Sequence, residues 1–399
     1  MVSLAELANI FLGVLRTPEF WFWFATYAVI ALSLNLEAGL TGIPNFGRHL
    51  AVVVGAIVAA ALPGYLSYAL LPQPYKQEIL SIAGTKSLPP YAGDYNSLIT
   101  SEINKYFAAN PAFALVMFLL TLIVAAVVGA LTGYLAAYPA ARLKEDYLAI
   151  TLLAAGEAVL VIAYNAGSLG GTQGMSVPNT LEWLDKLLAG PLGSKAHQVA
   201  TMIMMVLAAA VVLVYLELAV RSPLGRLLKG VRENEVASEA VGKDTAKVKL
   251  KTLMLGSAVA AVAGALYIMA TLGWIATAYD RITWTFWPWA MMILGGAGNN
   301  LGVVVGSFIL TYVYQFITYN QALFKGHLPF SPAWLHYLVL GLVLVLVLML
   351  KPEGLLPEKT TYPLPRRKLE EIAVKHGAPR EKKATADKAA LEEEPGGEA

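Results

Sequence analysis

The sequence predicts an all-α polytopic membrane protein with about nine transmembrane helices, some of them interrupted, around a central pathway. Apolar residues make up 57% of the 399-residue chain and charged residues 14%, whereas soluble globular proteins carry about 25% charged residues. Mean hydropathy is +0.60. Apolar runs of roughly 20 residues, the length that crosses a bilayer, recur along most of the chain. Lipid is therefore the expected solvent.

Nine segments are predicted to span the membrane. They are residues 19–36, 49–71, 112–138, 146–163, 198–220, 252–274, 285–297, 302–319 and 335–350. The 285–297 segment is short and ends in glycines, so we expect it to stop inside the membrane. Pro63-Gly64 should kink the 49–71 helix or end it early. Gly129 and Gly133, spaced four apart, indicate a helix-packing face.

The spans divide the chain into three parts. Residues 1–18 are expected to form an N-terminal interfacial helix, 19–356 the transmembrane domain, and 357–399 a disordered, charged cytoplasmic tail. Two long loops on the outer side should carry short helices, one at Ser97–Ala108 and a membrane-surface helix at 181–188. Aromatic residues near span ends are expected to anchor the helices at the two interfaces. They are Trp21, Trp23, Trp274, Trp284, Trp287, Trp334 and Tyr337.

Orientation follows from the positive-inside rule. With residues 221–251 in the cytoplasm, 21 of the 29 Lys and Arg lie in cytoplasmic segments and eight lie outside. The C-terminus is then cytoplasmic, in the plasma or inner membrane. Whether residues 4–15 also cross the membrane stays open.

Chemical motifs argue against an enzyme. The chain has no Cys, and its five His have no metal-ligand spacing. It also lacks the GxSxG, HExxH and GxxxxGK[ST] motifs. We therefore expect no catalytic residues, no metal, no cofactor and no nucleic-acid partner, and any ATP must bind to another subunit.

Candidate residues for a transport pathway lie at glycine-rich interruptions and at a carboxylate. Glu157 is the one ionisable residue well inside a predicted span, so it should face protein or water, with Ala154 and Val161 beside it. Simple helix packing is an equal alternative for Glu157. Interrupted segments in both halves of a transporter point to its central pathway, although ordinary tight turns also explain the glycines. The remaining candidates are Asn45, Phe46, Gly170, Gly171, Gly295 and Gly296.

The loop 221–251 is the most informative segment. Glu235–Val241 should form a short helix that Gly242 ends, with Ala237 and Ala240 on a small apolar face. Glu235 and Glu239 repel each other at this spacing, so intrinsic helix stability does not explain them. We predict docking into a partner's cleft; a basic loop bound to anionic lipid is the alternative.

Three stretches, in this order along the chain, resemble the membrane permease subunits of branched-chain amino acid ABC importers. The first is LNLEAGLTGIPNFG at 34–47 with Gly55-Ala56. The second is DYLAITLLAAGE at 146–157 with GGTQG at 170–174. The third is SPLGRLLKGVRENEVASEAVG at 222–242, followed by AGALY at 263–267 and LGGAGNNLG at 294–302. Asn45, Arg48 and Leu160 depart from the family pattern, where Ser, His and Arg are usual.

The resemblance implies a permease that forms part of a path for branched-chain or other hydrophobic amino acids. It implies two cytoplasmic ATP-binding subunits, a second permease (a homologue or a second copy) and an extracellular or periplasmic solute-binding protein. It also places ATPase coupling at Arg232, Glu233, Glu235, Ala237, Glu239, Ala240 and Gly242. A sugar or nucleoside ABC permease, an ion-coupled secondary transporter and a scaffold without transport are the alternatives, and the sequence leaves the substrate open.

Overall fold

The computed structural model describes residues 11–140, 145–325 and 329–358. Each of the nine segments predicted to span the membrane is helical. They correspond to α2 Pro18–Leu34, α3 Arg48–Leu70, α6 Pro111–Ala140, α7 Glu145–Asn165, α9 Ala196–Arg221, α12 Thr245–Thr271, α13 Trp287–Gly295, α14 Asn300–Tyr319 and α16 Leu335–Leu350. Seven helices in the described residues are long and apolar enough to cross a membrane, while α13 and α16 are shorter. The predicted all-α polytopic fold is confirmed.

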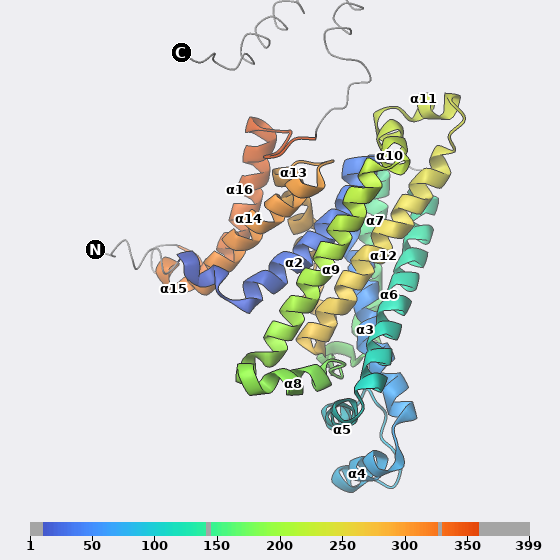
Figure 1. Cartoon of the computed structure of the whole chain (residues 1–399), viewed down its shortest axis with the longest axis vertical. Helices are drawn as coiled ribbons and strands as arrows, with labels where there is room; N and C mark the ends of the chain where they lie inside the picture. The colour runs from blue at the N-terminus through green and yellow to red at the C-terminus, as the bar shows by residue number, and fades with distance from the viewer. Residues whose placement is uncertain (1–10, 141–144, 326–328, 359–399) are drawn as a thin grey trace, which may run out of the picture. The chain divides into compact units, whose positions relative to one another are not determined.

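Shorter elements gather at the two ends of the helix bundle (Figure 1). At one end lie α4 Gln73–Ala83, α5 Asn96–Ala109 and α8 Glu182–Leu192. At the other lie α10 Pro223–Glu233 and α11 Glu235–Ala240. A two-stranded antiparallel sheet pairs β1 Met175–Ser176 with β2 Gly273–Trp274, with Met175 opposite Trp274. Helices α5 and α8 were predicted, but α4 was not; Pro72 and Pro74 stand at its start.

Helix α12 is the central packing element, with α3, α6, α2 and α9 against it. Glycines bring the backbones together: a Cβ on Gly55 would overlap the carbonyl oxygen of Ala261, and one on Gly133 that of Leu253. A Cβ on Gly129 would also overlap Ala261. Small residues allow such close approach between membrane helices, so the predicted packing face at Gly129 and Gly133 is confirmed.

Of the two outcomes expected at Pro63-Gly64, a kink or an early end, the early end does not occur. Helix α3 continues past Pro63 to Leu70, and the Tyr91 ring packs so closely on Gly64 that a Cβ there would overlap it. Tertiary contacts thus support the turns beyond the proline, where one backbone hydrogen bond is lost.

The aromatic residues near span ends divide into two groups. Trp274, Trp284 and Trp287 are at most 2% exposed and pack in the core, so for them an interfacial anchor is the wrong interpretation. Trp284 lies against Tyr279, with the ring centroids 5.3 Å apart. Trp334, in contrast, is 62% exposed. Burial of this kind reflects tertiary packing, which position along a span does not reveal.

The ends of the chain are only partly described. Residues 11–15 are helical, and Thr17 then begins α2 by accepting a hydrogen bond from the Phe20 N–H at 3.3 Å. The rest of the predicted interfacial helix, residues 1–10, and the predicted tail from 359 lie outside the described residues. Pro357 and Glu358, which we placed in the tail, lie against the bundle instead.

Candidate functional site

The interruption between α2 and α3 contains a buried ion pair that sequence reasoning missed. Helix α2 passes into the π-helical segment η1 Asn35–Gly39, and a loop leads to α3. Glu37 and Arg48 form a salt bridge in which both side chains are fully buried. Arg48 also donates hydrogen bonds to the Ser33 hydroxyl at 3.2 Å and the Gly256 carbonyl at 2.9 Å. The available signal was that opposite charges flank a glycine-rich stretch, but Glu37 lay just beyond the predicted span.

Asn45 belongs to this buried network. Its side-chain amide donates to Glu37 Oε2 at 2.8 Å, and its side-chain oxygen accepts from the Gly47 N–H at 2.9 Å. Phe46, next in sequence, stacks on Trp289 of α13, with centroids 4.5 Å apart. The Trp289 indole donates to the Asn45 carbonyl at 3.1 Å. These contacts join the first interruption to helix α13.

The second interruption, between α13 and α14, is also bonded to the first. Asn35 of η1 donates to the Asn300 side-chain oxygen at 2.9 Å and accepts from the Gly298 N–H at 2.8 Å. Gly295 and Gly296 are buried: a Cβ on Gly295 would overlap the carbonyl oxygen of Gly302, and Gly296 has φ +116°. Both predicted path residues therefore permit close backbone packing within this chain.

Glu157 does not lie in the interior of the chain. Val161, one turn away, is 60% exposed and Ala154 is also exposed, so the expectation that both face inward is wrong for this chain by itself. Glu157 nevertheless has a charged partner: Arg281 Nη1 lies 3.2 Å from its Oε1. Sequence reasoning placed Arg281 in an outer loop, and its position beside Glu157 depends on tertiary packing. Gly156 packs on His49, whose ring would overlap a Cβ there.

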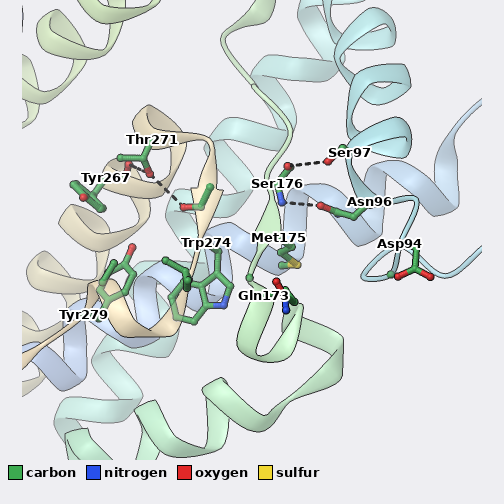
Figure 2. A pocket seen from close by; sticks show the side chains of 15 residues that line it. Asp94, Asn96, Ser97, Gln173, Met175, Ser176, Tyr267, Thr271, Trp274 and Tyr279 are labelled. Carbon is green, nitrogen blue, oxygen red and sulfur yellow. Dashed lines mark hydrogen bonds between the residues drawn. The ribbon is translucent and has the colours of Figure 1, made fainter.

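The sheet pocket, a cavity of ≈ 570 Å³, opens beside β1 and β2 (Figure 2). Asp94 and Ser97 lie on one side, and Trp274 and Tyr279 on the other. The Ser176 N–H donates to the side-chain oxygen of Asn96 at 2.7 Å, which ties β1 to α5.

Glycines shape the loop that leads into this pocket. Gly170 has φ +76° and Gly171 φ +55°, values that favour glycine because a Cβ is strained there. They turn the chain toward Gly174, whose φ is +73° and which lines the pocket. Gly170 and Gly171 themselves do not line it. The predicted path glycines of this loop therefore act through backbone conformation.

At the opposite end, α11 forms as predicted. Asn234 caps it by accepting from the Ala237 N–H at 2.9 Å, and Gly242, with φ +79°, ends it. Glu235 accepts a hydrogen bond from Lys249 Nζ at 2.6 Å, and this bond lowers the pKa of Glu235 below its usual range. Glu239 accepts from the Thr245 hydroxyl at 2.6 Å. Local partners thus account for the two acidic residues at i,i+4.

The apolar surface of α11 remains exposed, although Glu235 and Glu239 are bonded within the chain. Val236 is 76% exposed and Val241 72% exposed, and Ala237 and Ala240 are also exposed. A groove of ≈ 480 Å³ lies between α10 and α11, lined in part by Leu224 and Val241. An exposed apolar surface next to a groove is typical of a contact site for another protein.

Arg232 bonds α10 to the first interruption and to Glu358. It donates to the Gly39 carbonyl in η1 and forms salt bridges with Glu233 at 2.7 Å and Glu358 at 2.8 Å. Lys229 lies 2.6 Å from the same Glu358. Arg232 and Glu233, both predicted coupling residues, therefore bond to each other within the chain.

The segment 351–358, which we call the C-terminal strap, folds back on the α13–α14 interruption. The N–H groups of Leu355 and Leu356 donate to the carbonyls of Leu294 and Gly295 at 2.8 and 2.9 Å. Asn299 donates to the Leu356 carbonyl at 3.1 Å. With Glu358 bonded to α10, the strap joins α10 to the second interruption.

No group of three or more His, Asp or Glu side chains within the described ranges could hold a metal ion. The buried acidic and basic groups are instead bonded to one another and to amides. The arrangement is that of a helical bundle with two interruptions, a polar pocket at one end and an exposed helix pair at the other.

Comparison with known proteins shows the family to which the chain belongs. The family described as "Branched-chain amino acid transport system / permease component" matches residues 18–348. A probable branched-chain amino acid transport permease protein LivM of Methanocaldococcus jannaschii is 39% identical over 363 residues, which are 88% of this chain and 97% of that protein. The high-affinity LivM permeases of Escherichia coli and Salmonella typhimurium are each 29% identical over 55% of this chain and 52% of their own length. No solved structure matches. The chain therefore belongs to the permease family of branched-chain amino acid transport systems, as a multi-pass membrane protein.

Proposed function

We propose that this permease is one membrane subunit of an ABC importer for branched-chain or other hydrophobic amino acids. Two cytoplasmic ATP-binding subunits supply the energy, a second permease completes the path, and a solute-binding protein delivers the substrate outside. The family and the names of the relatives support the transport role and the substrate class. A sugar or nucleoside permease, or an ion-coupled carrier, is the alternative that uptake experiments must exclude.

The observation that carries the ATP-driven proposal is the exposed apolar face of α11. Helices α10 and α11 lie within the cation-rich segment 221–251, which the positive-inside rule places in the cytoplasm together with the C-terminus. A small, capped helix whose acidic residues are already paired presents Ala237, Ala240 and the two exposed valines to a partner. The sheet pocket then lies at the outer end, where a solute-binding protein would dock.

Coupling is expected to follow from the position of α10. Arg232 bonds to η1, and Glu358 bonds α10 to the strap on the α13–α14 interruption. A displacement of α11 by the ATPases would therefore reach both interruptions through direct contacts. Arg232 and Glu233 serve this internal connection, whereas Ala237 and Ala240 serve the docking contact.

Ala237→Trp or Ala240→Trp is expected to abolish substrate-stimulated ATP hydrolysis and uptake. A docked helix packs tightly, and overpacking costs about 1–3 kcal/mol per site. Both residues are exposed and outside the spans, so the variants should insert and fold normally. The measurement is ATP hydrolysis and radiolabelled leucine uptake by the complex reconstituted in vesicles.

Ala189→Trp on α8 is the matched control, because Ala189 is an exposed alanine at the opposite end of the bundle and does not line the sheet pocket. It should leave the stimulated hydrolysis intact. Full coupling in the α11 variants would show that the docking site is elsewhere. Leucine uptake that proceeds without ATP and depends on an ion gradient would support the secondary transporter instead.

A further inference from the structure

A partly exposed pair of opposite charges lies on α7, apart from the α11 docking surface and the sheet pocket. Glu157 of α7 and Arg281, which precedes the π-helical segment η6 Ile282–Phe286, form an ion pair. Their side chains remain 40% and 51% exposed, and one contact of 3.2 Å joins them. Within the part of the chain that the structure describes, neither charge makes another side-chain hydrogen bond. Each therefore keeps atoms free for a ligand.

The depth of the pair restricts what it can face. Glu157 lies within the apolar helix Tyr147–Asn165, several residues from either end. Half-exposed charges at such a depth are costly against lipid, so ionisable residues there face protein or a water-filled path. The exposed side of Glu157 and Arg281 is thus directed toward water or a partner subunit.

A buried histidine adds a second polar group beside the pair. His49 is fully buried and its ring lies over Gly156, the neighbour of Glu157. Thr285 of η6 holds the other side of the ring, with its hydroxyl 3.2 Å from Nδ1, and accepts the His49 N–H at 3.0 Å. Nε2 has no partner among the described residues. The ring is therefore fixed in place with one polar atom at Gly156.

We propose that Glu157 and Arg281 form a subsite for the zwitterionic head group of an α-amino acid in the translocation path. The carboxylate of Glu157 receives the substrate ammonium, and the guanidinium of Arg281 receives the substrate carboxylate, for which its planar fork is suited. When the zwitterion binds, the Glu157–Arg281 pair is replaced by two pairs, one between Glu157 and the ammonium and one between Arg281 and the carboxylate. No charge is therefore left uncompensated. Ala154 and Val161, exposed one turn to either side of Glu157, offer apolar surface to an aliphatic side chain.

This inference rests on the proposed function, because it assumes that amino acids pass along this face. Glu157→Gln and Arg281→Gln are each expected to lower leucine uptake per ATP hydrolysed by roughly tenfold to 100-fold, the effect of losing one charge-assisted hydrogen bond. The assay uses the complete reconstituted complex with saturating, leucine-loaded binding protein. Arg221→Gln is the control, since Arg221 and Glu217 form a comparable exposed pair on α9, 2.9 Å apart, and its uptake should not change.

The exchanged variant, Glu157→Arg with Arg281→Glu, separates binding from structure. It restores an ion pair but inverts the head-group orientation that the site demands, so uptake should stay low. Recovery of uptake in the exchanged variant, or near-normal uptake in both single variants, would overturn the subsite. Absence of ATP-dependent uptake of leucine and valine by the wild-type complex would instead overturn the proposed function and the subsite together.

Discussion

Arg48→Met is expected to lower the free energy of unfolding by about 3–5 kcal/mol, because it leaves the Glu37 carboxylate as an uncompensated buried charge. Both side chains of the pair are fully buried. The Ser33 hydroxyl and the Gly256 carbonyl, which accept hydrogen bonds from Arg48, lose their donor as well. Denaturant titration of the protein in detergent micelles, followed by tryptophan fluorescence, measures the loss.

The double variant Glu37→Gln with Arg48→Met should recover most of that stability. It removes both charges together, and replacing a whole buried ion pair by neutral groups is often close to neutral. Lys247→Met is the control: Lys247 and Asp244 are 2.8 Å apart but largely exposed, so the change should be under about 1 kcal/mol. A small loss in Arg48→Met, or no recovery in the double variant, would mean that the pair is not the element that stabilises the first interruption.

A chain that ends at Lys351 is expected to lose substrate-stimulated ATP hydrolysis, whereas a chain that ends at Glu358 keeps it. The shorter chain lacks the backbone hydrogen bonds of Leu355 and Leu356 and both salt bridges of Glu358. At about 0.5–1.5 kcal/mol for each hydrogen bond, their sum is enough to release α10 from the α13–α14 interruption. The chain that ends at Glu358 lacks only residues that none of these bonds uses.

Hydrogen exchange of the α10 amides tests the same prediction directly. Exchange should accelerate in the chain that ends at Lys351 and in Glu358→Gln, and should stay unchanged in the chain that ends at Glu358. Glu353→Gln is the matched control, because Glu353 is an exposed acidic residue of the strap that forms no salt bridge in the described residues. Equal exchange in all four variants would contradict a role for the strap in holding α10.

Local features of the sequence were enough to locate the helices. Each span is an apolar run whose length matches the bilayer, and each such run is helical. The position of helix α11 could also be predicted from the local sequence, because Asn234 and Gly242 are capping residues. The early end that Pro63 made possible does not occur, because a contact from another loop, Tyr91 on Gly64, supports the helix beyond the proline.

The site residues depended on more than local pattern. Asn45 and Phe46 stood out by their place in a glycine-rich stretch, but their roles came from α13, through Trp289. Trp284, expected at an interface, is buried against Tyr279. For Asn45 and Phe46 the deciding neighbour therefore lies far along the chain.

The sequence by itself thus determined that the chain is a helical membrane protein, where its helices run, and which family it resembles. Hydropathy and capping act over one helix length, so they can be read without a fold. Only the tertiary structure decided which charges meet: Glu37 with Arg48, Glu157 with Arg281, and Glu358 with Arg232. The last two pairs are more than 100 residues apart in sequence. An ionisable residue inside a span is stable only beside a partner or water, and the packing of helices, not their spacing in sequence, brings the partners together.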